Sequence, residues 1–212
     1  MPALSALGQR QQFLLKALLH RRRGLTVDEL SQELAISRNA VNQHLTSLEA
    51  NGFIENSSLS STGGRPSRVY TLTENGLELF PKHYALFSNL LIHWIRQKLG
   101  SKELKACLSD LGKQVAQEFV GRVQKNTAPA KKISEVATIL HELGYEAQVE
   151  LNPENSPEII ANNCVFHQLA NECNEVCELD LTLLSELLNA NIDHKECMAK
   201  GGQCCRFGIS KK

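Results

Sequence analysis

The 212-residue sequence predicts an α+β fold with a helix-rich front, further helices in the middle and a small mixed domain at the end. Two kinds of pattern predict it. Apolar residues recur at helical spacing through most of residues 9–124, and short alternating segments follow near residues 53–72 and beyond residue 145. Hydrophobic residues make up 42% and charged residues 22%, which is an ordinary globular composition and excludes a disordered chain.

The first 52 residues predict a helix followed by a helix-turn-helix. Thr26 and Glu29 have the spacing of a capping box at the start of the second helix. Ser37 is a favourable N-cap for the third helix. The expected buried face of the third helix repeats at i, i+4 and i+7, through Val41, Leu45 and Leu48.

A β-hairpin is predicted directly after these helices. Phe53–Asn56 and Arg68–Leu72 read as strands, and a polar, glycine-containing tip lies between them. A hairpin in this position is the wing of a winged helix, and GRPSRVYTLTENG resembles the wings of ArsR/MarR/DeoR-type bacterial regulators. We therefore expect a winged-helix DNA-binding domain over residues 1–80, although a merely solvated helix face is the alternative. The expected contacts to double-stranded DNA are Arg38, Asn39, Asn42, Gln43, Thr46, Arg65 and Arg68.

The middle of the chain, residues 81–125, is predicted to be a helical dimerisation region. The segment around Leu86–Ile95 is more apolar than one face of a lone helix requires, so we expect it to pack against its twin in a homodimer. Cys107 is expected to be a small buried hydrophobic residue of the next helix. Residues 125–131 are interpreted as a linker.

The last part, residues 131–212, is predicted to be a small α+β sensor domain with a different charge balance. Residues 1–72 and 73–129 each contain eight Lys/Arg and five Asp/Glu, whereas residues 130–212 contain seven and thirteen. This basic front and acidic rear indicate that a polyanion faces the front. The carboxylates Glu172, Glu175, Glu178 and Asp180 are interpreted as a solvated face. Since no nucleophile–base pair or phosphate loop is evident, we do not expect an enzyme.

Six of the seven cysteines fall within residues 164–212. Four of them lie at the expected ends of secondary-structure elements: Cys164, Cys177, Cys197 and Cys205. Cys177 begins a helix, where the positive dipole end favours a thiolate. Such ends can converge, and four thiolates suit an iron–sulfur cluster or a zinc ion. Plain buried cysteines remain an alternative.

The cysteine-rich segment from Cys164 to Phe207 resembles the C-terminal domain of the Suf-operon repressor (SufR-type) family. The matching features are Cys164, Val-Cys-Glu at Cys177, Glu-Cys at Cys197, and Gly-x2-Cys-Arg-Phe ending at Phe207. The resemblance implies a homodimeric repressor that carries a [4Fe–4S] cluster in each subunit and controls genes for iron–sulfur cluster assembly. It also favours Cys205 over its neighbour Cys204 as a ligand, and alternation along a strand allows only one of the two to face the site.

A second resemblance leads to a different expectation. The ending Glu-Cys-x3-Gly-Gly-x2-Cys-Arg-Phe is also similar to the vinyl-reductase-like family of ligand-binding domains, which implies a regulator that binds a small molecule. No secretory signal or membrane span is evident, so a reducing cytoplasm is the expected compartment and no membrane partner is expected.

Overall fold

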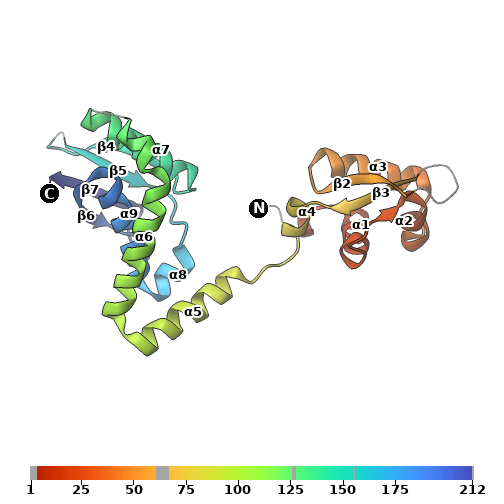
Figure 1. Ribbon diagram of the computed structural model, residues 1–212, viewed down its shortest axis with the longest axis horizontal. Helices are drawn as coiled ribbons and strands as arrows, with labels where there is room; N and C mark the ends of the chain where they lie inside the picture. Colours follow the sequence, from red (N-terminus) through yellow and green to blue (C-terminus); the bar gives the residue numbers. More distant parts are fainter. Residues whose placement is uncertain (1–3, 61–66, 126–127, 155, 212) are drawn as a thin grey trace. The chain divides into compact units, whose positions relative to one another are not determined.

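The computed structural model describes residues 4–60, 67–125, 128–154 and 156–211. It divides into two compact units, residues 1–83 and 84–212. The mixed α+β class is confirmed, with a winged helix, a helical middle and a small C-terminal sheet region (Figure 1). None of the helices in the described ranges is both long and apolar enough to cross a membrane.

The first unit combines three main helices with a three-stranded antiparallel sheet of order β1-β3-β2. Its core joins buried leucines of all three helices to Ile54 and Tyr70 of the sheet. The elements are η1 (Leu4–Ala6), α1 (Gln9–His20), β1 (Leu25–Thr26), α2 (Val27–Leu34), α3 (Arg38–Ala50), β2 (Ile54–Ser60), β3 (Ser67–Leu72) and α4 (Glu74–Glu78).

The expected helix starts are confirmed. The Thr26 hydroxyl accepts a hydrogen bond from the Glu29 amide at 3.3 Å, and the Glu29 carboxylate accepts one from the Thr26 amide at 2.7 Å. Ser37 caps α3 by accepting from the Ala40 amide at 3.2 Å. The predicted inner face of α3 is buried, because Val41, Leu45 and Leu48 are each at most 1% exposed. As a result, the face of α3 opposite to Val41, Leu45 and Leu48 points away from the core of the first unit.

Gly24 is required for strand pairing and does not cap α1, because α1 already ends at His20. Its φ angle is +85°, in the left-handed region that favours glycine. A Cβ at this position would lie 2.6 Å from the carbonyl oxygen of Tyr70. The glycine therefore allows β1 to pair with β3 directly after the turn.

The second unit packs helices on one face of a four-stranded antiparallel sheet of order β4-β5-β7-β6. Its main core joins α6, α7 and α9 to the inner side of β5 and β7. The elements are α5 (Tyr84–Leu99), α6 (Ser101–Gln124), α7 (Pro129–Glu142), β4 (Ala147–Leu151), β5 (Pro157–Ala161), α8 (His167–Glu172), η2 (Asn174–Val176), α9 (Cys177–Leu188), β6 (Ala190–Glu196), η3 (Met198–Lys200) and β7 (Cys205–Lys211).

Two local predictions for this unit are wrong. Cys107 is exposed rather than buried. The buried face of α6 follows a four-residue spacing through Leu104, Leu108, Gly112 and Ala116, which leaves Cys107 beside it. The expected linker at residues 125–131 is shorter, because α7 already begins at Pro129 and proline is favourable in the first helical turn.

Helices α6 and α9 pack closely at Gly112. A Cβ there would lie 2.6 Å from the carbonyl oxygen of Leu179 and 3.0 Å from the Cβ of Thr182. Beside this point, the Thr182 hydroxyl donates to the hydroxyl of Ser109 at 3.0 Å. Only glycine permits this contact between the two helices. The contact also positions α9, whose first residue is the predicted ligand Cys177.

We expect Gly112→Ala to destabilise the second unit by about 1–3 kcal/mol, because the added methyl group meets backbone rather than a movable side chain. The gain in helix propensity, about 1 kcal/mol, offsets part of this cost. Gly121→Ala in the same helix is the matched control, since nothing lies within 4 Å of its Cβ position. Thermal unfolding of both variants tests the contact, and an unchanged or raised stability of Gly112→Ala would contradict it.

Candidate functional site

Two thiols and an imidazole meet at the junction of α9 and β6. Cys177 is the first residue of α9, His194 lies within β6 and Cys197 directly follows β6. One ligand atom from each of the three lies within 4.8 Å of the other two. Cysteine sulfur and histidine nitrogen are the donors that zinc and iron–sulfur clusters use. These three residues can hold a metal ion, and we call them the inner triad.

The other two predicted ligands lie around the same point. Cys164 follows β5, and Cys205 begins β7 opposite Ala161 of β5. Cys197 and Cys205 belong to the same buried cluster, and Cys177 packs against it. Cys164 lies three residues beyond Ala161, the β5 residue that pairs with Cys205. Only Cys177 and Cys197 of the four predicted cysteines belong to the inner triad.

Burial opposes ionisation of the thiols of Cys164, Cys177 and Cys205. Burial, supplemented by the neighbouring thiols, raises the pKa of Cys177 to about 12 and that of Cys205 to about 12. Burial also raises the pKa of Cys164. The expectation that the start of α9 favours a thiolate at Cys177 is therefore wrong, because burial outweighs the partial charge of the helix dipole. Metal binding has to displace these protons.

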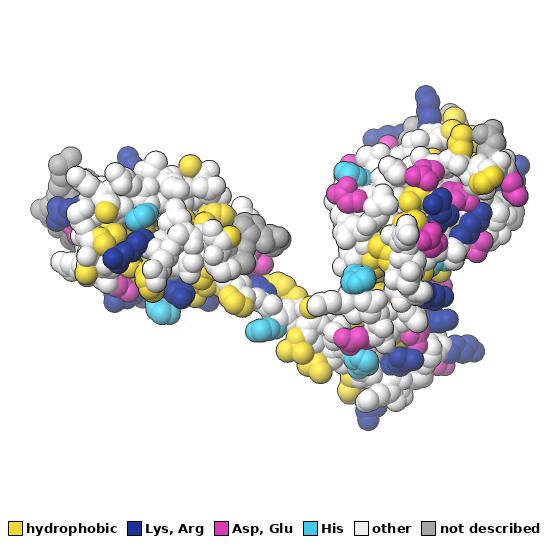
Figure 2. Space-filling view, turned by 180° about the vertical axis from the view of Figure 1, so that it is seen from behind, with side chains coloured by type: hydrophobic (Ala, Val, Ile, Leu, Met, Phe, Trp, Pro, Cys, Tyr) yellow, Lys and Arg dark blue, Asp and Glu magenta, His cyan; other side chains and the backbone are white. Residues whose placement is uncertain are grey.

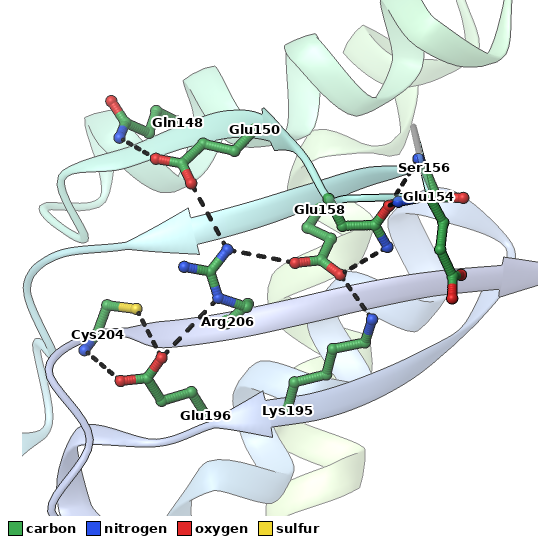
Figure 3. A network of polar contacts seen from close by, with 10 residues as sticks. Gln148, Glu150, Glu154, Ser156, Glu158, Lys195, Glu196, Cys204 and Arg206 are labelled. Atoms are coloured by element: carbon green, nitrogen blue, oxygen red, sulfur yellow. Dashed lines mark hydrogen bonds and ion pairs between the residues drawn. The ribbon is translucent and has the colours of Figure 1, made fainter.

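Cys204 and Cys205 lie in different environments, since Cys204 immediately precedes β7 and Cys205 is its first residue. Cys205 is part of the main core together with Cys197. The Cys204 thiol donates to the carboxylate of Glu196 at 3.5 Å, and that carboxylate lies 3.9 Å from the Arg206 guanidinium (Figure 3). Cys204 therefore belongs to a polar network on the other side of β7.

The centre of that polar network is Glu158, which is only 3% exposed. Its carboxylate accepts hydrogen bonds from Lys195 at 2.6 Å, Asn152 at 3.2 Å and Arg206 at 3.3 Å (Figure 3). The hydrogen bond from Lys195 is the main reason that the pKa of Glu158 is lowered. The network thus fixes β5, β6 and β7 to one another through charged side chains.

We expect Lys195→Met to lower the melting temperature of the second unit by roughly 2–4 °C at neutral pH, because Glu158 loses its closest partner. A lowered folded pKa stabilises the fold above the ordinary carboxyl pKa of 4.5 and loses this effect as the pH falls through the folded value. The difference from wild type should therefore shrink below pH 4.5. Lys211→Met on β7 is the control, and a difference that persists unchanged in acid would contradict this account.

Two carboxylates that the sequence places on a solvated face are buried. Glu175 accepts a hydrogen bond from Ser101 at 2.7 Å and pairs with Arg96 at 3.2 Å. Asp180 accepts one from the Tyr145 hydroxyl at 2.6 Å, and burial raises the pKa of Asp180 to about 6 despite that bond. Their partners tie α9 and η2 to neighbouring segments, so these groups support the packing around the cysteines.

Cys173 and His167 lie apart from the inner triad. Cys173 is buried in a separate cluster with Leu104, Leu108 and Val176, and its thiol donates to Glu175 at 3.2 Å. His167 is 3.1 Å from the side-chain amide of Asn171 and lines a cavity of about 330 Å³ next to Cys164. Neither residue belongs to the group formed by Cys177, His194 and Cys197.

His194 is the site residue that the sequence reasoning missed. Its Nε2 is the one buried side-chain nitrogen or oxygen in the described ranges that has no hydrogen-bond partner. Its ring stacks on Phe207, with centroids 4.8 Å apart. Burial lowers the pKa of His194, which keeps the imidazole neutral. The alternation of β6 could have revealed it, since Ile192 and His194 share the face opposite to Asp193 and Lys195.

The expected DNA-contacting side chains form an outward face on the first unit. Asn39, Asn42 and Gln43 are exposed on α3. Arg38 is exposed as well and pairs with Asp28 of α2 at 2.5 Å. The Thr46 hydroxyl, also on α3, donates to the backbone carbonyl of Asn42 at 3.0 Å. On β3 of the wing Arg68 is exposed, while Arg65 lies outside the described residues.

Comparison with known proteins defines the class. Residues 12–91 match the family of winged helix DNA-binding domains. The first unit therefore contains a winged helix DNA-binding domain. This domain occurs in many regulators and does not by itself identify the Suf-operon repressor family.

No curated protein matches the sequence. Solved structures with partial similarity include a mutant of S. aureus MepR, at 20% identity over 51% of this chain and 80% of that one, with a TM-score of 0.33. The zinc-responsive MarR family member ZitR of Lactococcus lactis is 23% identical over 53% and 76%, with a TM-score of 0.32. The phenol-responsive sensory domain of the transcription activator PoxR is 14% identical over 61% and 75%, with a TM-score of 0.43. Similarity this low indicates neither a metal nor a ligand for this chain.

Proposed function

We propose that this protein is a homodimeric transcriptional repressor whose affinity for DNA depends on an iron–sulfur cluster, and that its targets are genes for cluster assembly. In this proposal the ligands are drawn from Cys164, Cys177, Cys197 and Cys205, and the cluster is of the [4Fe–4S] type. The inner triad, with Cys205 in the same core cluster as Cys197, is the observation that supports the proposal.

The donor set fits such a group. Four thiolates would place several negative charges in a site where two of the cysteines are buried and two are half-buried, so they need a compensating cationic core. Thiolate sulfur is the ligand that iron–sulfur clusters prefer. When bound, the cluster would cross-link the ends of β5, α9, β6 and β7 and would add its own sensitivity to iron supply and oxidation.

A zinc ion is the second candidate, favoured by the geometry of the inner triad. Two cysteines and one histidine, with one further thiol, make a common structural zinc set. The two candidates differ in colour, in iron content and in acid-labile sulfide. A small organic molecule, as in vinyl-reductase-like domains, would leave the protein without bound metal.

Helix α5 is proposed to form the dimer interface through an exposed apolar stripe. Phe87, Leu90 and Trp94 are 67%, 61% and 57% exposed, which is unusual for side chains of this size. Hydrophobic side chains are visible on the molecular surface in Figure 2. We define the α5 stripe as Tyr84, Leu86, Phe87, Leu90, Leu91 and Trp94.

The opposite side of α5 already has partners in its own unit. Ile92 and Ile95 pack against the cluster formed by Leu104 and Leu108, and His93 contacts Glu172 at 3.1 Å. A second copy of the chain suits the α5 stripe, because a two-fold dimer places two recognition helices on a two-fold DNA site.

We expect Asn42→Ala and Gln43→Ala to weaken binding to the preferred DNA sequence by about 10- to 100-fold each, since a bidentate base contact contributes roughly 1–3 kcal/mol. Arg68→Ala should weaken binding to all sequences alike and reduce its salt dependence. Gln117→Ala, at an exposed position of α6, is the matched control. Fluorescence anisotropy on a site selected from random DNA measures all four. Equal affinity of the two α3 variants and wild type would contradict the proposed reading face.

The coupling between cluster and DNA is tested by measuring one preparation in two states. Loaded protein and chelator-treated protein are titrated with the same selected DNA under anaerobic conditions. The proposal requires tighter binding by the loaded form, because a ligand alters DNA affinity only by favouring the DNA-competent state. Equal affinities of the two forms would leave a DNA-binding protein without cluster control.

A further inference from the structure

The imidazole of His194 is held with one nitrogen unsatisfied. A buried polar atom without a hydrogen bond costs about 1–3 kcal/mol, and such atoms therefore require an explanation. Among the described residues, His194 Nε2 is the only buried side-chain nitrogen or oxygen of this kind. The neighbouring cysteines, Cys177 and Cys197, offer an explanation for this unpartnered nitrogen.

Stacking on Phe207, at an interplanar angle of 22°, fixes the plane of the imidazole. Nε2 is enclosed and makes no hydrogen bond. A neutral imidazole that carries its proton on Nδ1 presents a lone pair at Nε2, which a metal ion can take.

We propose that Nε2 of His194 is a ligand of the metal centre, together with the sulfur atoms of Cys177 and Cys197. The 4.8 Å limit between one nitrogen of His194 and the two sulfur atoms carries this inference, and the unpartnered Nε2 indicates which nitrogen binds. It deepens the proposed function and rests on it only for the identity of the metal group, because the inner triad would bind a single soft cation equally well.

Histidine ligation has a consequence for the outer thiols. Cys164, Cys177, Cys197, Cys205 and His194 provide five donors, whereas a [4Fe–4S] cluster or a zinc ion takes four. One of the two outer cysteines, Cys164 or Cys205, is then dispensable for binding. Replacing a thiolate by a neutral imidazole also makes the site less negative, and histidine ligation raises the reduction potential in iron–sulfur centres that have it.

A cavity lies beside the inner triad. Cys177 and His194 both line this cavity of about 290 Å³, which also includes Lys105 and Lys200, two exposed side chains. A metal ion in the cavity would lie next to two residues of the inner triad.

The test uses two probes on the full-length protein. Apoprotein is titrated with Co²⁺, whose spectrum reports sulfur and nitrogen ligands, and protein with ¹⁵N-labelled histidine is reconstituted with a cluster and reduced for electron–nuclear spectroscopy. We expect a ¹⁵N coupling in wild type and its loss in His194→Phe. That variant should also bind Co²⁺ at least about tenfold more weakly. His167→Phe, beside Cys164, is the control and should change neither signal.

Phenylalanine retains the packing on Phe207, so the melting temperature of the apo variant should equal or exceed that of wild type. Unchanged Co²⁺ affinity in His194→Phe, or a reconstituted wild-type cluster without ¹⁵N coupling, would overturn the inference. If wild type binds Co²⁺ through His194 but takes up no cluster, the inference stands and the proposed iron–sulfur function fails.

Discussion

Replacing Cys197 with serine is expected to reduce the metal content of the protein by more than about tenfold, the largest effect of any single substitution in the second unit. Cys197 belongs to the inner triad together with Cys177, and it lies in the same buried core cluster as Cys205. Serine has nearly the same size but lacks the soft sulfur donor. Iron, zinc and sulfide analysis of the purified variant, together with its absorption spectrum, measures the loss.

The controls for Cys197→Ser are serine variants of the three cysteines that are not predicted ligands. Cys204→Ser, Cys173→Ser and Cys107→Ser should each retain the metal and the spectrum. Cys204 contacts Glu196, Cys173 lies in a separate cluster and Cys107 is exposed. Retention of the metal in Cys197→Ser, or its loss in all four variants alike, would contradict the assignment.

The second large effect is expected for Leu90→Asp on α5. Leu90 lies in the middle of the α5 stripe and is 61% exposed in the single chain. A carboxylate in the proposed two-fold interface meets its own copy and should dissociate the dimer. DNA affinity should then fall by about 10²–10⁴-fold, because the two winged helices no longer bind as one linked unit.

Sedimentation equilibrium and DNA titration of Leu90→Asp measure the two effects separately. Gln114→Asp, at an exposed position of α6, introduces the same charge outside the stripe and should leave the protein dimeric. If Leu90→Asp remains a dimer with full DNA affinity, α5 is not the interface.

Local sequence signals predicted the first unit well. A capping box, an N-cap and an i, i+4, i+7 repeat each depend on residues within a few positions of one another, so Thr26, Ser37 and Val41 could be assigned directly. The role of Gly24 could not be assigned in this way, because the contact that requires glycine there comes from the distant strand residue Tyr70.

Burial in the second unit depends on distant neighbours, and there the sequence was less informative. Glu175 and Asp180 look like surface carboxylates until Ser101, Arg96 and Tyr145 are placed beside them. Cys107 has the periodicity of a core position but lies beside the buried face of α6, which runs through Leu104 and Leu108. Spacing alone did not distinguish these cases.

The candidate metal site could be predicted only in part from the sequence. Thiols at the ends of elements were expected to converge, and the structure brings Cys177 and Cys197 together in the inner triad, with Cys205 in the same core cluster as Cys197. His194 carries no motif and lies three residues before Cys197 in an ordinary strand. Its importance follows from an unsatisfied nitrogen that only three-dimensional neighbours reveal.

The most direct test of the central claim is an anaerobic purification followed by an absorption spectrum and a count of iron and acid-labile sulfide. The proposed function predicts a brown protein that absorbs at about 400 nm and contains about four irons and four sulfides per subunit. A colourless protein that holds one zinc ion, or no metal, after the same purification would contradict it.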